Sequence, residues 1–428
     1  MKNQESIRGE IRTLIETYFD NASRTSAFVP GKTKVSVGWP IYDHREIISA
    51  VDSLLDLWIS MGPKVATFEN DHADYVGTQH GIAVNSGSSA NLVALAALIQ
   101  ADVLEEGAEV IVPSATFTTV LSPILQNGLR AVVVDVEDDT YNIAPSAIEE
   151  AITSDTGLIM PVHSLGCPAD MKRIMSISEK YDIPILEDCC EAHAACVEDK
   201  RVGSFGLVSS YSFFVAHNMT TGEGGMVMTS DDKIKDIAKS IREFGRRATD
   251  VKGGPRFHYN DGYLHDYDER YVFERLGYNV RMTDIAASLG IEQLKKLDDL
   301  TDQRIELATY LTEEMSGVSE FLKLPATPDG VLHSFYGYAI VVKSGAPFRR
   351  RDIVRFLEDH GIETRGFMGG NLAAQPAYRD LEQIRVVGDL AMTKLLADNA
   401  FFIGCHPAID KDARKYVVDT FKRFLGQF

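Results

Sequence analysis

A histidine and a serine stand five residues apart where an expected strand gives way to a loop. The run at residues 207–214 is rich in β-branched and aromatic residues, and the glycine-rich sequence GEGG follows at residues 222–225. Ser212 lies in the run and His217 in the polar turn after it. Ligands of open α/β sheets bind at the carboxyl ends of the strands. There the imidazole of His217 would be well placed in pKa to move protons near neutral pH.

A Gly/Ser turn opens an expected helix in the sequence NSGSSAN, residues 85–91. Free backbone N–H groups, hydroxyl groups and the positive end of the helix dipole make such a turn suited to a phosphate. A simple helix cap and tight turn would use the same residues. Gly87 and Ser88 are the candidates for holding a phosphate.

Two carboxylates follow the apolar run at residues 183–186, in the sequence EDCCEAH. Asp188 and Glu191 would therefore lie at a strand end, where a carboxylate can bind a ligand or cap a helix. Another aromatic candidate, Phe117, follows a strand in the sequence PSATFTT, although a phenylalanine taken at random is most often a core residue. The sequence GYNVRMTD, residues 277–284, contains Asn279 and Arg281, which by themselves would be a helix cap and a surface charge.

The composition limits the class of protein. With 428 residues, 45% hydrophobic and 25% charged, the chain is typical of a globular protein with a substantial core. A formal charge of −19 argues against general binding of nucleic acid or of an anionic membrane. The N-terminal 20 residues favour an amphipathic helix over a signal peptide, and no apolar run approaches a membrane span. We predict a cytoplasmic protein whose five cysteines are reduced thiols.

Short apolar runs alternate with helix-length segments from residue 81 onward. The runs are residues 81–84, 109–112, 131–136, 158–162 and 183–186. This alternation favours an α/β protein with a mostly parallel sheet covered by helices on both faces. The polar stretch at residues 250–271 interrupts the pattern, and we expect a long loop there.

We expect three parts along the chain. An N-terminal segment, residues 1–60, would contain an amphipathic helix and an apolar helix at residues 47–59. A large domain would span residues 61–315. A smaller α/β domain, residues 316–428, would contain helices at residues 350–360 and 410–425.

Taken in order, these motifs resemble those of the sugar-nucleotide aminotransferases, a branch of the fold-type I pyridoxal-phosphate (PLP) enzymes. The family patterns are N-S-G-T/S-x-A, P-S-x-T-F-x-x-T, E-D-x-x-x-A-H, S-F-x-x-x-K-x-x-x-x-G-E-G-G and G-Y-N-x-R-M-T-D. The resemblance covers residues 28–428. It implies a fold-type I PLP-dependent transferase, with a mostly parallel seven-stranded sheet, helices on both faces and a smaller C-terminal α/β domain.

The resemblance assigns cofactor contacts. Gly87, Ser88 and Ser212 would bind the cofactor phosphate, Phe117 would stack on the pyridine ring, and Asp188 would pair with the ring nitrogen and keep it protonated. The other assigned residues are Glu191 and Asn279 for the cofactor, and Arg281, Arg365 and Asn371 for the sugar nucleotide. The family's Asn at the position of Asn279 lies close to the partner subunit's cofactor phosphate, so the resemblance implies a homodimer with shared active sites.

His217 stands where the family has the lysine that forms the Schiff base with PLP. That replacement in an otherwise intact segment resembles the nucleotide-sugar 3-dehydratases, which use pyridoxamine phosphate (PMP). The cofactor would then be held noncovalently, and His217 would remove a proton from its C4′ methylene group. As imidazolium, His217 could protonate the departing C3 oxygen of a nucleotide-linked 4-keto-6-deoxyhexose. Glu191 also fits, because aminotransferases commonly carry Gln there and the colitose-type dehydratase carries Glu.

Two subgroups of these dehydratases differ in how they complete the cycle. The ascarylose type carries a [2Fe–2S] cluster, and the colitose type regenerates PMP from L-glutamate. The chain as a whole looks closer to the ascarylose type, and Cys190 matches its first cluster cysteine. The next cluster positions hold Ala248 and Asp250, however, and no cysteine occurs between Cys196 and Cys405. A [2Fe–2S] cluster needs four thiolates or a His/Cys mixture, so we predict no iron–sulfur cluster and no other metal.

The favoured interpretation is a cluster-free, PMP-dependent 3-dehydratase, a carbon–oxygen lyase of deoxysugar biosynthesis such as that of lipopolysaccharide O-antigen. Its partners would be a nucleotide sugar, L-glutamate as amino donor and a second copy of the chain. Two alternatives remain: an aminotransferase-like or epimerising enzyme acting on a nucleotide keto-sugar, and a non-catalytic sugar-nucleotide-binding homologue.

Overall fold

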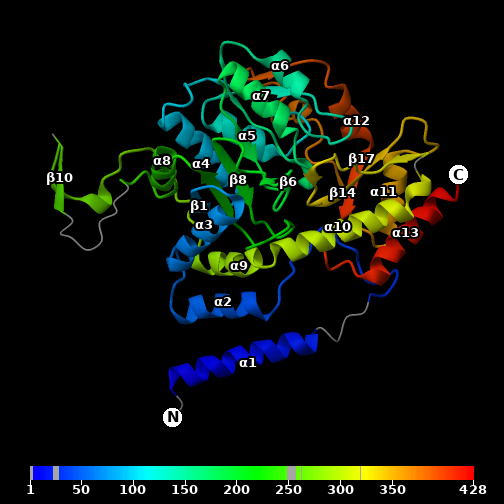
Figure 1. Cartoon of the computed structure of the whole chain (residues 1–428), viewed down its shortest axis with the longest axis horizontal. Helices are drawn as coiled ribbons and strands as arrows, with labels where there is room; N and C mark the ends of the chain where they lie inside the picture. Colours follow the sequence, from blue (N-terminus) through cyan, green and yellow to red (C-terminus); the bar gives the residue numbers. More distant parts are fainter. Residues whose placement is uncertain (1–2, 23–27, 248–256, 262, 319) are drawn as a thin grey trace.

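One large β-sheet forms the centre of the computed structural model, which describes residues 3–22, 28–247, 257–261, 263–318 and 320–428 (Figure 1). Two four-stranded sheets, ordered β1-β9-β8-β5 and β16-β3-β2-β4, make up this centre. Parallel bridges from Ile159 to Ile185 and from Val162 to Asp188 join them. The strands are β1 (His80–Val84), β2 (Glu109–Pro113), β3 (Arg130–Val134), β4 (Thr156–Ile159), β5 (Leu186–Asp188), β8 (Val208–Ser212), β9 (Gly225–Thr229) and β16 (Ile384–Val386).

The pairing in this sheet is parallel except on either side of β9. Seven of the strands match the expected mostly parallel, seven-stranded sheet, and the short β16 adds an eighth at the edge. The predicted α/β fold class is therefore confirmed.

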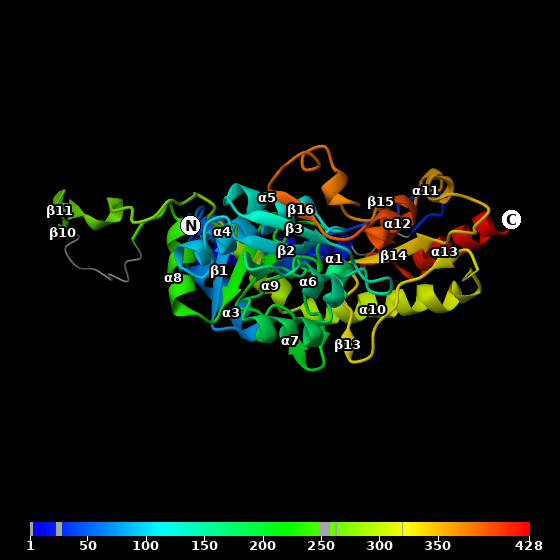
Figure 2. The same cartoon turned by 90° about the horizontal axis from the view of Figure 1, so that it is seen from above.

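Helices cover both faces of the sheet, because alternate residues of a strand point to opposite faces. Ile82 and Val84 of β1 pack with α4, α5 and α8, whereas Ala83 packs with α3 and α9 on the other face. Farther along the sheet, α6 and α7 cover that second face (Figure 2). The helices are α3 (Pro63–Val76), α4 (Gly87–Gln100), α5 (Thr118–Gln126), α6 (Pro145–Ala151), α7 (Met171–Tyr181), α8 (Asp232–Arg242) and α9 (Asp284–Leu294).

Apart from the central sheet, a four-stranded sheet lies toward the C-terminus, in the order β12-β14-β17-β15. It shares a core with α10, α11 and α13, in which Tyr338 and Phe401 are fully buried. Val35 also belongs to this core, although it lies in the predicted N-terminal segment. The domain limits at residues 60 and 315 therefore stay predictions. The elements are β12 (Leu322–Lys323), β14 (Gly337–Val342), β15 (Thr364–Gly366), β17 (Ala400–Gly404), α10 (Leu297–Glu314), α11 (Arg350–Asp359), α12 (Ala391–Asn399) and α13 (Lys411–Leu425). A small third sheet pairs β13 (Val331–Leu332), β6 (Cys196–Val197) and β7 (Lys200–Arg201).

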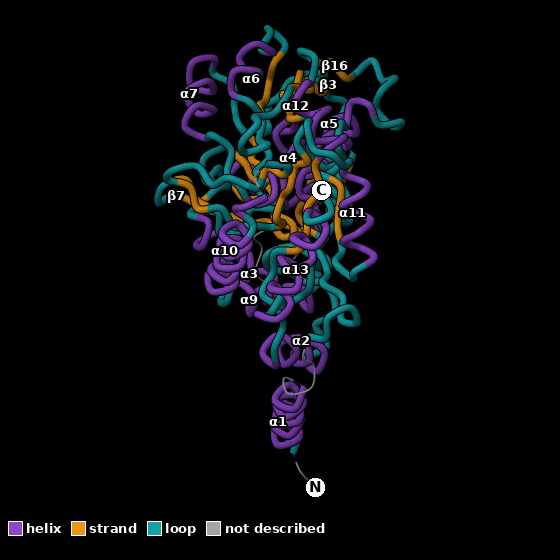
Figure 3. The backbone as a smooth tube through the Cα atoms, turned by 90° about the vertical axis from the view of Figure 1, so that its right-hand side faces the viewer, coloured by secondary structure: helices purple, strands orange, loops and turns teal. Residues whose placement is uncertain are grey.

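Two helices precede the central sheet. α1 (Gln4–Ala22) lies beyond α2 (His44–Leu55) at one end of the molecule (Figure 3). α2 begins three residues before the predicted start at residue 47, because Asp43 and Glu46 form a capping box. No helix within the described ranges has the length and apolar character needed to cross a membrane.

Two expectations about local structure were wrong. The strand expected at residues 183–186 is displaced toward its C-terminal side, to β5, because Pro184 has no N–H to donate to a neighbouring strand. The stretch expected to be a loop contains an antiparallel hairpin, β10 (Phe257–Asp261) and β11 (Leu264–Asp268), which projects from the body in Figure 1. Residues 250–256 of that stretch lie outside the described residues.

A buried ion pair joins α3 to α8. Arg242 pairs with Glu69, and both side chains are less than 10% exposed. The same guanidinium group donates to Ala83 O at 2.9 Å, and the Glu69 carboxylate accepts from Ala83 N at 2.9 Å. The pair therefore satisfies both backbone groups of Ala83 on the edge of β1 that faces away from β9.

We expect Glu69→Gln to lower the free energy of unfolding by about 3 to 5 kcal/mol, because Arg242 would be left as an uncompensated buried charge. Urea unfolding followed by circular dichroism measures the loss. Lys415→Ala is the matched control: it removes an exposed ion pair with Asp419 and should change stability by less than about 1 kcal/mol. Equal stabilities for the two variants would contradict the assignment.

Candidate functional site

The N-terminus of α4 meets the ends of β5 and β8 at one glycine. A Cβ atom on Gly87 would lie 2.5 Å from Cβ and 2.9 Å from Oγ of Ser212, and 3.0 Å from Sγ of Cys190. Only glycine permits so close an approach. The Ser212 hydroxyl group therefore lies beside the first turn of α4, and the exposed Ser88 follows directly. The unpaired N–H groups of a helix N-terminus and these hydroxyl groups are the donors that a phosphate requires.

Asp188, the last residue of β5, is held by two neutral donors. It is 3% exposed, and its two oxygens accept from Asn91 Nδ2 at 2.8 Å and from Cys190 N at 3.0 Å. Asn91 lies one turn along α4 from Gly87 and also donates to Thr119 O at 3.1 Å. Because a carboxylate has four lone-pair sites, Asp188 can still accept from a cationic N–H of a ligand.

Phe117 presents an open aromatic face close to this carboxylate. It caps α5 and is 55% exposed, which rules out the core role that a random phenylalanine would have. Its neighbour Thr119 is bonded to Asn91, so the Phe117 segment is fixed relative to Asp188. Asn371 joins the same segment, where it accepts from Ser114 Oγ at 3.0 Å. An exposed ring beside a fixed carboxylate fits a planar, nitrogen-containing aromatic ligand.

His217 lies in the turn after β8, where its backbone N–H donates to Phe214 O at 3.0 Å. Its ring centre is 5.2 Å from that of Tyr336 and 6.1 Å from that of His193. Burial lowers the pKa of His217 well below its usual 6.5, and His193 and the charge of Arg304 lower it further. The imidazole is therefore neutral at pH 7. Its Nδ1 atom is buried without a hydrogen-bond partner in the protein.

His193 fixes the strand end that carries this turn. Its Nε2 lies 2.7 Å from the carbonyl oxygen of Ser212. Burial lowers the pKa of His193 to about 4, so the ring is neutral at pH 7. Because a carbonyl can only accept, Nε2 carries the proton of the neutral ring.

Glu191 is surrounded by protein although part of its surface remains accessible. One oxygen, Oε2, accepts from Leu165 N at 2.8 Å. Burial, together with the negative charge of Asp188, raises the pKa of Glu191 to about 8, although the hydrogen bond from Leu165 opposes the rise. This carboxyl group is therefore largely protonated at pH 7.

Sequence reasoning missed three contributors to the site. Leu165, in a turn with φ of 51°, and Tyr336, just before β14, form one wall between Glu191 and His217. The buried Arg304 of α10 donates to Tyr336 O at 3.4 Å. No local pattern marks Leu165 or Tyr336 as part of a site, and an arginine in a helix usually faces solvent.

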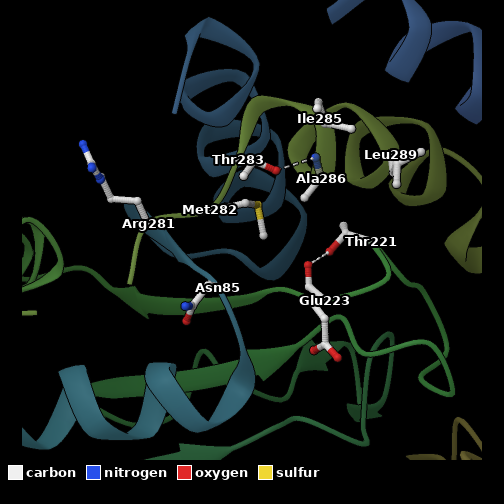
Figure 4. Close-up of a pocket in the computed structure, with 9 residues that line it drawn as sticks. All are labelled: Asn85, Thr221, Glu223, Arg281, Met282, Thr283, Ile285, Ala286 and Leu289. Atoms are coloured by element: carbon white, nitrogen blue, oxygen red, sulfur yellow. Dashed lines mark hydrogen bonds between the residues drawn. The ribbon is translucent and has the colours of Figure 1, made fainter. Parts of the chain in front are cut away.

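Asn279 and Arg281 lie on a neighbouring part of the surface. Arg281 forms a bridge with Val84 of β1, which places the segment next to the phosphate candidates. The Arg281 side chain donates to Asn279 Oδ1 at 3.1 Å and to Glu243 Oε1 at 3.3 Å. A pocket of about 310 Å³ lies beside it (Figure 4). Its lining consists of Asn85, Thr221, Glu223, Arg281, Met282, Thr283, Ile285, Ala286 and Leu289.

The predicted site residues thus fall into two groups. The first lies at the ends of β5 and β8 and around α4: Gly87, Ser88, Phe117, Asp188, Glu191, Ser212, His217 and, through Ser114, Asn371. Asn279 and Arg281 form the second group. Arg365 lies on β15 and pairs with Glu363 at 2.6 Å. Its positive charge also acts on Tyr336, where it opposes the rise in the pKa of the phenol group. The structure does not bring Arg365 into contact with the first group.

The cysteine nearest the site is neutral. Burial raises the pKa of the Cys190 thiol well above its usual value, and Asp188 adds to the effect. Its Sγ atom packs against Gly87. Ala248 and Asp250, at the cluster positions of the ascarylose-type enzymes, lie outside the described residues, so the lack of an iron–sulfur cluster stays a prediction.

Within the described ranges, His163, Glu187 and Cys189 form a group that could hold a metal ion. Their polar atoms already have partners, because His163 Nδ1 accepts from Ala169 N at 3.0 Å. The Glu187 carboxylate lies 3.2 Å from His163 Nε2 and accepts from the N–H groups of Gly203, Phe205 and Gly206. We interpret this group as structural.

Comparisons with known proteins agree with this architecture. The sequence profile of the DegT/DnrJ/EryC1/StrS aminotransferase family matches residues 42–422. The chain is 35% identical over 431 residues to the lipopolysaccharide biosynthesis protein RfbH of Salmonella typhimurium, covering 98% of each chain. It is 34% identical over 419 residues to dTDP-4-dehydro-2,6-dideoxy-D-glucose 3-dehydratase of Saccharopolyspora spinosa, covering 96% of this chain and 90% of the relative.

A solved structure shows the same fold. GDP-4-keto-6-deoxymannose-3-dehydratase, with a trapped PLP-glutamate geminal diamine, has a TM-score of 0.83 at 29% identity and covers 90% of this chain and 99% of its own. The predicted fold-type I PLP transferase fold is therefore confirmed. With a profile match over most of its length and relatives above 30% identity, the chain belongs to the DegT/DnrJ/EryC1/StrS aminotransferase family.

Proposed function

We propose that this protein is a PMP-dependent 3-dehydratase that removes the C3 hydroxyl group of a nucleotide-linked 4-keto-6-deoxyhexose without an iron–sulfur cluster. The observation that carries the proposal is the neutral, partly buried His217 in the turn after β8, where other family members have the PLP-binding lysine. Similarity to 3-dehydratases over almost the whole chain supports this assignment.

The residues at the ends of β5 and β8 fit a noncovalently held vitamin B6 cofactor. Gly87, Ser88 and Ser212 would hold its phosphate, and Phe117 would cover one face of its ring. Asp188 would pair with the ring nitrogen, for which its two neutral donors leave capacity. When bound, the protonated ring supplies an electron sink. Glu191 would lie at the edge of the same site.

His217 acts as the base in this proposal. Its neutral imidazole would accept a proton from the C4′ position of the cofactor at one of its ring nitrogens. The rings of Tyr336 and Phe214 pack beside the imidazole, where they would orient it and limit its contact with water.

The remaining contacts concern the substrate and a second subunit. Arg281, Arg365 and Asn371 would bind the sugar nucleotide, with Arg281 and Arg365 exchanging their present carboxylate partners for phosphate oxygens. The exposed Asn279 would approach the cofactor phosphate of a second copy, so the active form would be a homodimer. L-Glutamate would return the amino group to the cofactor, as the trapped PLP and glutamate of the related dehydratase suggest.

Incubation with PMP and a panel of nucleotide-linked 4-keto-6-deoxyhexoses, with and without L-glutamate, tests the reaction. Mass spectrometry should show a 3-deoxy-4-keto product, one oxygen atom lighter than its substrate, from at least one sugar, with repeated turnover only when L-glutamate is present. Amine transfer or inversion at the sugar would establish the aminotransferase-like or epimerising alternative instead. Binding without any change in the mass of the sugar or in its stereochemistry, which proton NMR checks, would establish a non-catalytic homologue.

His217→Asn should slow deuterium exchange at C4′ of bound PMP by at least about 1,000-fold, because amide nitrogen cannot accept the proton. Exchange is measured by proton NMR, and the absorbance of bound cofactor shows that the site still fills. His80→Asn, at the start of β1, is the matched control and should exchange at the wild-type rate. Wild-type exchange in the His217 variant would exclude this base.

The pH dependence of exchange tests the burial of His217. Only the neutral imidazole accepts a proton, so the rate falls when the pH drops below the pKa of that group. Since this pKa lies well below 6.5, we expect a constant exchange rate from about pH 8 down through pH 6.5, with the decline only at lower pH. A half-maximal rate near pH 6.5 would show an ordinary, solvent-exposed imidazole instead.

A further inference from the structure

Three carboxyl groups at the end of β5 and just after it have very different surroundings. Glu187 accepts from three backbone N–H groups and lies against His163. Asp188 accepts from Asn91 and Cys190. Glu191 accepts a single hydrogen bond, from Leu165 N to Oε2. Hydrogen bonds to a carboxylate favour its charged form, so the protein supports the charge of Glu187 and Asp188 much more than that of Glu191.

The groups that face Glu191 do not favour its charge either. From its own segment come Asp188, an anion, and the neutral thiol of Cys190. Tyr336 faces it from the segment before β14, and the turn of Leu165 offers one neutral peptide. None of these four groups is cationic. Two neighbouring carboxylates repel each other when both are charged, and Glu191 has fewer hydrogen-bond donors than Asp188 to support its charge.

The free oxygen of Glu191 is available to a ligand. Oε1 makes no hydrogen bond within the part of the chain that the structure describes, and the residue is partly exposed. His217 lies on the other side of the wall that Leu165 and Tyr336 form. Tyr336 N donates to Leu165 O at 2.9 Å, Leu165 N donates to Glu191, and the Tyr336 ring lies 5.2 Å from His217. Leu165 and Tyr336, which are hydrogen-bonded to each other, therefore lie between the carboxyl group of Glu191 and the neutral imidazole of His217.

We infer that Glu191 is the proton donor of the site, a role separate from that of the base His217, and that its acceptor is the oxygen leaving C3 of the sugar. The inference rests on the proposed dehydratase function. The C3–O bond breaks with its electron pair going to oxygen, and that oxygen takes the proton from Oε1 and leaves as water. Glu191 becomes a carboxylate and regains a proton from solvent through its exposed edge. His217 keeps the proton that it accepted from C4′.

Infrared spectroscopy of the ligand-free protein tests the first part of this inference. A carboxylic acid band should be present at pH 7, should disappear as the pH rises through about 8, and should be missing from Glu191→Gln. Glutamine keeps the acceptor for Leu165 N–H and has the shape of the neutral acid, so it removes only the transferable proton. A titrating band that persists in Glu191→Gln, or no band in the wild-type protein, overturns the inference whatever the enzyme's substrate is.

Turnover tests the second part. In Glu191→Gln, we expect dehydration about 100-fold slower with C4′ exchange unchanged, because only the acid step is removed. Wild-type dehydration should fall above about pH 8, where exchange continues. Glu137→Gln, another half-buried glutamate with a raised pKa, is the matched control and should dehydrate normally. Dehydration at the wild-type rate in Glu191→Gln, or loss of exchange together with dehydration, overturns the role. If no sugar loses water with any variant, the dehydratase proposal itself fails, while the infrared result stands alone.

Discussion

The close approach of α4 to the ends of β5 and β8 is the constraint on which the site depends. At Gly87, the helix backbone lies so near Ser212 and Cys190 that no side chain fits between them. Asn91, one turn farther along the same helix, then reaches both Asp188 and the Thr119 carbonyl. One helix position therefore sets the phosphate donors, the anchored carboxylate and the exposed Phe117 ring relative to one another. A shift of α4 by one residue would disconnect all of them.

Burial acts on the two proton-carrying groups of the site in opposite directions. Removal from water disfavours the charged form, which is the cation for an imidazole and the anion for a carboxyl group. The pKa of His217 falls and that of Glu191 rises, so both groups are neutral at pH 7. One can then only accept a proton and the other can readily donate one. Asp188 differs from Glu191 in its hydrogen bonds, because its two oxygens accept from Asn91 and Cys190.

Segments far from the motif supply that burial. The turn of His217 is covered by Gly38, whose Cβ would lie 2.7 Å from Cβ of Ala216, and by Tyr336. Arg304 adds a buried positive charge that opposes protonation of the imidazole. In the proposed function, His217 stands at the position of the family's lysine and acts as a base beside a cofactor held without a covalent bond. The family scaffold is thus retained while the chemistry of one position changes.

The sequence by itself determined the layers of the fold and the glycine–serine turn that opens α4, because hydrophobic periodicity and such turns are local signals. It also located His217, Asp188 and Phe117 at strand or helix ends. It misplaced β5, since one proline displaces the pairing, and it missed the hairpin of β10 and β11, whose aromatic residues lie within a polar stretch. Only the tertiary structure decided the protonation of Glu191 and His217. Their pKa values depend on Leu165, Tyr336 and Arg304, which reach the site from distant segments and leave no trace in the local pattern.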